Sequence, residues 1–215
     1  MSRTRRLLQF SALTVAFAGL LSCGDRASAP DVAPVPVLTE AEANARTTVP
    51  LTRSVSLEKP GVIADFEFEL PPPGRTAVSE LVIGLRIEDA DSKVLMKRTD
   101  LILSERLPAE VRLIRLDGPA PAEVPLRRIS SNLRERLPIE ADGRVPGATT
   151  TSVDNGMLRD VGLVDDRVHY QDLELANADA PAPGRYRIIV RLAENRPALT
   201  DRPAELLVAY SYLAK

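Results

Sequence analysis

The feature that most constrains the fold of this chain is a strict alternation of apolar and polar residues in several short stretches. Over residues 62–70 every even-numbered position is apolar, and three of the four odd-numbered positions are acidic. Large apolar residues also recur at every second position over 81–88, 185–192 and 206–212. Successive side chains of a β-strand point to opposite faces, so each stretch predicts a strand with one face on a core and the other in water. Such strands are typical of antiparallel sheets.

Turn-forming pairs separate these stretches. Pro60-Gly61 and Asp117-Gly118 are typical of turns, and Asn155-Gly156 predicts a two-residue hairpin between two flanking strands. Many short strands divided in this way predict an all-β fold. We expect an antiparallel β-sandwich, immunoglobulin-like or jelly-roll-like, over residues 51–215. Its helical content should be minor, and residues 94–106 and 126–137 could contain it.

A different pattern occupies the first 23 residues. Arginines at positions 3, 5 and 6 precede an almost uncharged apolar run over 7–21, which is too short for a transmembrane helix. Ser22 then precedes the only cysteine, Cys23. A small residue directly before a cysteine at this place resembles the bacterial lipobox. The resemblance predicts a lipoprotein signal peptide over residues 1–22 and lipid on Cys23. An ordinary secretory signal with a chance cysteine is the alternative.

Residues 23–50 are expected to form a lipid-anchored flexible tether, because four prolines interrupt them and large apolar residues are sparse. Within them, Thr39 and Glu42 have the spacing of a capping box, which could start a helix of about two turns. The anchor predicts a protein of the bacterial cell envelope, attached to a membrane through its lipid and facing the periplasm. Each buried methylene contributes ~0.8 kcal/mol, so two or three acyl chains would hold the protein essentially permanently.

Charge and cysteine content argue against several classes of function. Signal cleavage removes three of the 28 basic residues, which leaves 25 against 30 acidic residues. This acidic balance argues against a nucleic-acid partner, which requires a basic surface. With Cys23 committed to lipid, no thiol remains for a disulfide, a nucleophile or a metal ligand.

No catalytic constellation stands out in the sequence. His169 is the only histidine, and no G-x-S-x-G motif accompanies it. A histidine at a strand surface is therefore the favoured interpretation over a general base. Asp89 and Asp91 alternate as calcium ligands do, but the central glycine and terminal glutamate of a calcium loop are missing. The sequence predicts a protein that is not an enzyme, with no cofactor and no metal site.

The strongest candidate for a binding surface is the region 138–172. Residues 138–166 are the longest stretch poor in large apolar residues, which is typical of a projecting loop. Carboxylates there could pair with a basic patch on a partner, and a tyrosine could anchor the interface. The residues predicted to contact a partner are Asp154, Asp165, Asp166 and Tyr170. The alternative is a flexible surface insertion that contacts nothing.

Several stretches also match a known group of proteins. Pro60-Gly61-Val62 leads into the strand 64–68, the alternating strand 81–87 follows, Pro183-Gly184 opens a third strand, and residues 196–199 precede the last one. In these features the domain resembles small proteobacterial lipoproteins with an uncharacterised β-sandwich domain. Some of those proteins are thought to act as immunity proteins against secreted toxins, including lipase effectors. The matching residues are structural, so the resemblance implies a scaffold and no site residues.

These observations predict an envelope lipoprotein that acts as a non-catalytic protein-binding module. An immunity or inhibitor protein facing the periplasm is the specific form that the resemblance implies, with a secreted toxin or an envelope protein as its partner. The alternative is a structural or glycan-binding envelope lipoprotein, because an aromatic side chain such as that of Tyr170 could face a sugar.

Overall fold

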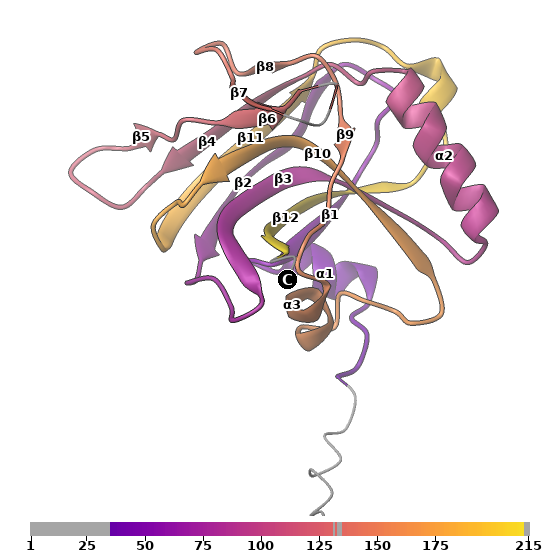
Figure 1. The fold of residues 1–215 in the computed structure, drawn as a ribbon, viewed down its shortest axis with the longest axis horizontal. Helices are drawn as coiled ribbons and strands as arrows, with labels where there is room; N and C mark the ends of the chain where they lie inside the picture. The colour runs from indigo at the N-terminus through magenta and orange to yellow at the C-terminus, as the bar shows by residue number, and fades with distance from the viewer. Residues whose placement is uncertain (1–34, 131, 133–134, 213–215) are drawn as a thin grey trace, which may run out of the picture. The chain divides into compact units, whose positions relative to one another are not determined.

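Two antiparallel β-sheets face each other in the computed structural model, which describes residues 35–130, 132 and 135–212 (Figure 1). The large sheet has the strand order β1-β12-β3-β10-β6-β7, and β9 pairs with β10. Its strands are β1 (Leu51–Val55), β3 (Ala77–Asp89), β6 (Arg127–Ile129), β7 (Arg136–Pro138), β9 (Thr149–Thr150), β10 (His169–Asp179) and β12 (Ala204–Tyr212). The small sheet has the order β2-β11-β4-β5, and β8 pairs with β4. Its strands are β2 (Gly61–Leu70), β4 (Ala109–Arg115), β5 (Ala122–Glu123), β8 (Arg144–Val145) and β11 (Gly184–Leu192). The predicted antiparallel β-sandwich is confirmed.

Helices are short in the described part of the chain, as expected. They are α1 (Glu40–Ala45), α2 (Ser92–Ser104), α3 (Asn155–Asp160) and the 3-10 helix η1 (Pro197–Leu199). Of the two segments that could contain helix, 94–106 contains most of α2, whereas 126–137 contains β6 and most of β7. The side chain of Asp91 caps α2 by accepting the N–H of Lys93 at 2.8 Å. Leu95 and Ile102 of α2 join the main core, and the helix closes one end of the sandwich (Figure 1). None of the described helices is long and apolar enough to cross a bilayer.

The core between the two sheets follows the predicted phase of the strands. The rings of Phe68 and Tyr186, from neighbouring strands of the small sheet, stack with their centroids 5.9 Å apart. The guanidinium carbon of Arg53 lies 4.7 Å from the ring centre of Phe66, which is only partly buried. Apolar residues that lie in phase along the other alternating strands are also buried, namely Leu81, Ile83, Leu85, Ile188, Val190, Val208 and Tyr210.

The alternation of β2 changes phase near the start of the strand. Val190 of β11 pairs with Ala64, whereas the next residue, Arg191, pairs with Val62. Ile63 is therefore an extra residue in the ladder, a β-bulge that shifts the side chains before it to the opposite face. Val62, which a strict alternation would place in the core, is 49% exposed.

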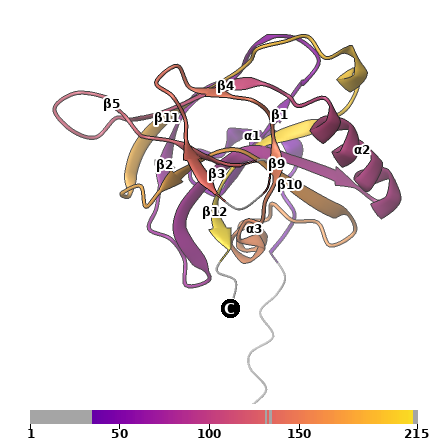
Figure 2. The same cartoon turned by 45° about the horizontal axis from the view of Figure 1, so that its top comes forward.

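The outer faces of the two sheets differ. That of the small sheet is exposed and carries ion pairs between neighbouring strands, such as Asp65–Arg187 and Glu67–Arg185, as the alternation predicted. The outer face of the large sheet is covered by a second apolar cluster, which consists of Ala43, Val82, Val153, Leu158, Leu163, Leu207 and Ala209. The prediction of one wet face is wrong for the middle of the large sheet, because α1, α3 and their flanking segments pack there (Figure 2).

The N-terminal segment contributes to this covering layer through Leu38 and Ala43, whereas Val49 at its other end belongs to the main core. The compact unit starts at Val35, so the predicted start of the domain at residue 51 is too late and the predicted tether over 23–50 is too long. The expected capping box forms between Thr39 and Glu42 at the start of α1. The N–H of Leu38 donates to the carbonyl oxygen of Gly162 at 2.8 Å, which holds the segment in place. The predicted signal peptide, residues 1–22, and Cys23 lie outside the described residues.

The Asn155-Gly156 pair begins a helix and does not form the predicted hairpin turn. Asp154 is the N-cap of α3, and its Oδ1 accepts the N–H groups of Gly156 and Met157 at 3.0 and 3.2 Å. Capping by the preceding aspartate overrides the turn preference of the pair. The region 138–166 is not a projecting loop either, since it supplies β8, β9 and part of the second apolar cluster.

Candidate functional site

A groove of about 570 Å³ opens on the covered side of the large sheet. Outward-facing residues of β1, β12 and β3 contribute to it, together with residues from the segments 37–43 and 162–170. It therefore lies where the N-terminal segment meets the region predicted to bind a partner. The charged and aromatic residues that shape it include Glu40, Arg86, Glu88, Asp165, Tyr170 and Glu205.

Three charged residues form a row across the large sheet, and two of them, Arg86 and Glu205, line this groove. Glu205 of β12 and Asp172 of β10 are the direct register partners of Arg86 on β3. Arg86 is 1% exposed and Asp172 is 7% exposed. Burying a charge is unfavourable unless it is paired and hydrogen-bonded, so the row is not explained by packing alone.

Two contacts hold the guanidinium of Arg86. Its Cζ lies 3.6 Å from the centre of the Tyr170 ring, which is a cation–π contact. Its Nη1 donates to the carbonyl oxygen of Leu163 at 2.6 Å. The Nε and Nη2 atoms are buried and have no hydrogen-bond partner among the described residues. The Tyr170 hydroxyl in turn accepts the N–H of Asp165 at 2.9 Å, which ties the 162–170 segment to the sheet.

Burial shifts the protonation of the two carboxylates beside Arg86. It raises the pKa of Asp172 to about 6, although the charge of Arg86 opposes the shift. It also raises the pKa of Glu205, where the guanidinium of Arg86 again opposes the shift and the carboxylate of Glu88 adds to it. Both carboxylates therefore take up a proton at a higher pH than carboxylates in water do. A change that removes their negative charge, or that places a positive charge beside it, should stabilise the fold.

We expect Asp172→Asn to stabilise the fold at neutral pH. Because the folded pKa lies above the unfolded one, the folded state binds the proton more tightly, and this contribution is lost as pH rises from about 4 to about 6. Asparagine does not titrate, so the variant should be as stable as the wild type at pH 4 and about 3 kcal/mol more stable at pH 7. Glu205 remains to compensate Arg86. Urea unfolding of both proteins between pH 4 and pH 7 measures the difference, and a difference independent of pH would contradict the prediction.

The four predicted contact residues have different surroundings. Asp165 and Tyr170 lie at the groove, and hydrogen bonds from the Arg167 side chain and main chain lower the pKa of Asp165 to about 2. Asp166 is exposed, pairs with Arg159 at 2.9 Å and does not line the groove. Asp154 is 2% exposed and accepts a hydrogen bond from Thr76 at 2.6 Å as well as capping α3. The prediction of Asp154 as a contact residue is therefore wrong, because its carboxylate is used inside the fold.

His169 lies at the start of β10 and its side chain is exposed. Its register partner on β3 is Asp89. Asp89 is engaged elsewhere, since it pairs with Arg98 at 3.3 Å and accepts the N–H of Asp91 at 2.9 Å. His169 does not line the groove. Asp89 and Asp91, the two aspartates considered as calcium ligands, are therefore engaged in contacts of the turn before α2.

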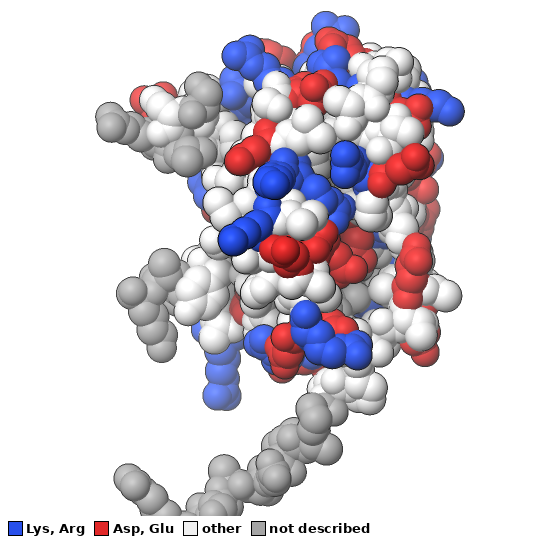
Figure 3. Space-filling model, turned by 90° about the vertical axis from the view of Figure 1, so that its right-hand side faces the viewer, with Lys and Arg blue, Asp and Glu red and all other residues white. Residues whose placement is uncertain are grey.

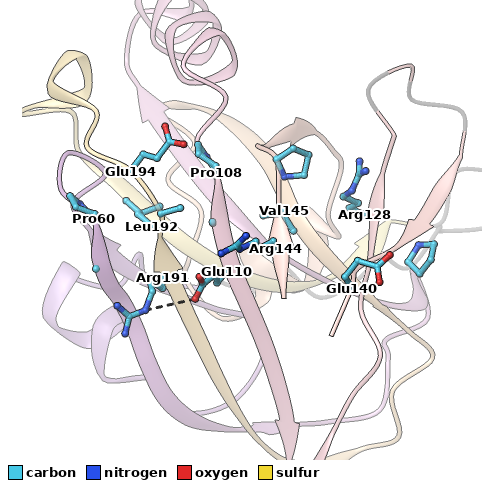
Figure 4. A pocket seen from close by; sticks show the side chains of 15 residues that line it. Pro60, Pro108, Glu110, Arg128, Glu140, Arg144, Val145, Arg191, Leu192 and Glu194 are labelled. Atoms are coloured by element: carbon cyan, nitrogen blue, oxygen red, sulfur yellow. Dashed lines mark ion pairs between the residues drawn. The ribbon is translucent and has the colours of Figure 1, made fainter. Parts of the chain in front are cut away.

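A second and larger hollow, of about 840 Å³, lies at one end of the sandwich near the strands β4, β8 and β11 (Figure 4). Three acidic and three basic side chains line it. Most of them have partners: Arg191 pairs with Glu110 at 3.9 Å, Arg144 with Asp142 at 3.5 Å, and Glu194 with Arg196 at 2.6 Å. Because these exposed pairs leave no net charge, the larger hollow has nothing to select a charged ligand. The groove that contains Arg86 is therefore the better candidate site, although it is smaller.

Charges of both signs are interspersed on the face shown in Figure 3, where blue and red side chains alternate without forming a basic stripe. No family model, curated protein or solved structure matches the chain.

Proposed function

We propose that this protein is a lipid-anchored, non-catalytic protein-binding module of the bacterial cell envelope, and that the groove over Arg86 is its partner-contact surface. The N-terminal pattern that ends at Cys23 supports the anchor. The observation that carries the binding function is the groove itself, where two predicted contact residues, Asp165 and Tyr170, are held beside a buried arginine. An immunity or inhibitor protein facing the periplasm is the specific form that we propose.

Rigidity supports a binding role for this surface. The wall at 162–170 is fixed by the bond between Asp165 and Tyr170 and by the bond between Arg86 and Leu163. The lining segment 37–43 is fixed to this wall by the bond between Leu38 and Gly162. A surface that is ordered before binding loses little conformational entropy when a partner docks, and this favours specific recognition.

Site-specific photo-crosslinking in the intact cell envelope tests this function. A photoreactive residue replaces Val168, which lines the groove, and in a matched control it replaces Val62, which is exposed on the small sheet. We expect a discrete protein adduct from position 168 and none of the same mass from position 62. Mass spectrometry of the adduct identifies the partner.

Two outcomes would contradict the proposed function. The absence of any protein adduct at position 168 would remove the groove as a contact surface. Equal adducts at positions 168 and 62 would show unspecific proximity in the envelope. Tyr170→Ala should weaken the adduct at position 168 without loss of the protein, because the tyrosine supports Arg86 at the floor of the groove.

A further inference from the structure

The groove carries an excess of negative charge. Four carboxylates line it against two arginines, Arg86 and Arg167. Arg167 is committed to Asp165, since its Nη2 donates to a carboxylate oxygen of that residue at 2.6 Å. The carboxylates that remain outnumber Arg86, so the groove favours a positively charged ligand and repels an anion. They belong to Glu40, Glu88 and Glu205.

These three carboxylates come from three different elements. Glu40 lies at the start of α1 and accepts a hydrogen bond from Ser54 at 2.7 Å. Glu88 lies on β3 and is exposed, and Glu205 lies on β12 and is partly buried. Burial is the main cause of the raised pKa of Glu205, and the charges of Glu88 and Glu40 add to it. A cation placed among the carboxylates would relieve this repulsion.

Arg86 provides a second, independent indication of a ligand. Its side chain lines the groove, and its Nε and Nη2 lack a hydrogen-bond partner among the described residues. Buried donors without acceptors are rare in proteins, because each one has given up its hydrogen bonds to water without replacing them. A ligand that suits this groove must therefore bring acceptor oxygens as well as positive charge.

We propose that the groove binds a basic side chain, lysine or arginine, that is presented on a peptide segment of the partner protein. The inference rests on the proposed protein-binding function and adds the chemistry of the contact. The cationic group lies between Glu88 and Glu205, and main-chain carbonyl oxygens beside it face the unpaired N–H groups of Arg86. A peptide supplies both parts, whereas a free anion is repelled and a free cation leaves Arg86 without an acceptor.

Saturation-transfer NMR on the full-length lipoprotein in detergent micelles tests this chemistry. The probes are acetyl-Gly-Lys-Gly-amide, its arginine analogue and the uncharged acetyl-Gly-norleucine-Gly-amide, with calcium chloride, sodium phosphate and a neutral trisaccharide as competitors. We expect saturation of the lysine and arginine peptides, strongest at the methylene next to the charged group, and little for norleucine. None of the three competitors should displace the basic peptides.

The double variant Glu88→Gln/Glu205→Gln should bind the basic peptides about tenfold more weakly, as loss of charge-assisted hydrogen bonds does. Because burial already disfavours the charge of Glu205, the variant should keep its fold, which a melting curve checks. The matched control is Glu67→Gln/Glu69→Gln, which removes the same charge from exposed positions of β2 and should bind as the wild type does.

The possible results separate this inference from the proposed function. Equal binding by the two double variants, equal saturation of the norleucine peptide, or displacement by calcium, phosphate or the sugar would overturn the basic-side-chain proposal. The photo-crosslinked adduct at position 168 reports on protein binding itself. If that adduct persists in Glu88→Gln/Glu205→Gln at wild-type level, the protein-binding function stands and the proposed chemistry of the contact is wrong.

Discussion

Replacing Gly84 with alanine is expected to destabilise the folded domain severely. Gly84 lies in the middle of β3, opposite Glu174 at a point where the register of β10 shifts. A Cβ at this position would overlap the carbonyl oxygen of Leu173 and lie 2.9 Å from its carbonyl carbon. These are main-chain atoms of the neighbouring strand, so no side-chain rotation relieves the overlap.

The two central strands of the large sheet would have to separate, and both apolar clusters depend on β3. We expect Gly84→Ala to lose more than about 4 kcal/mol of the free energy of unfolding, a large part of what a domain of this size has. Gly74→Ala is the matched control, because its Cβ would meet only the flexible end of Met157, at 3.2 Å from the sulfur. Urea unfolding followed by circular dichroism measures both, and a Gly84→Ala midpoint close to that of Gly74→Ala would refute the argument.

Replacing Cys23 with alanine is expected to abolish acylation completely. The sequence leaves no other cysteine to carry a lipid, and the predicted processing requires the cysteine for both acylation and cleavage. The wild-type protein should therefore incorporate an alkyne analogue of palmitate, and Cys23→Ala should incorporate none and keep the mass of the uncleaved precursor. Membrane fractionation is a poorer readout, because the uncleaved apolar run at 7–21 can itself hold a precursor to the membrane.

Gly24→Ala provides the control for this prediction, since it alters the neighbouring residue and leaves the cysteine in place. It should be acylated and cleaved as the wild type is. A wild-type N-terminal peptide that starts elsewhere, or that carries no acyl mass, would replace the lipid anchor by an ordinary secretory signal. The protein would then not be attached to a membrane. The proposal that its groove binds a partner would keep its physical basis.

The sandwich could be predicted from the sequence because the period of two is a local property of each strand. Phe68 and Tyr186 face the core for that reason alone. The covering of the large sheet could not be predicted in the same way, because it depends on segments far away in the chain. One signal was present: the uninterrupted apolar run 206–209 in β12 is typical of a strand buried on both faces. The bulge at Ile63 left no comparable signal.

The candidate site was predicted only in part. Asp165 and Tyr170 were found because an acidic, aromatic segment follows a region poor in large apolar residues. Arg86 and Glu205 were missed, although a charged residue between Leu85 and Ile87 was visible in the sequence. Their meaning depends on the register that sets Glu205, Arg86 and Asp172 side by side, and register between distant strands cannot be read from one sequence.

Because the compact unit starts at Val35, only a short piece of chain would connect the domain to a lipid anchor. Only eleven residues, 24–34, separate Cys23 from Val35. Even fully extended, that length of chain reaches about 40 Å. A lipid on Cys23 would thus confine the domain to a thin layer above the bilayer, where its encounters with other membrane-bound molecules become a search in two dimensions at raised effective concentration. A weak contact in the groove could then suffice for a partner that shares the same membrane.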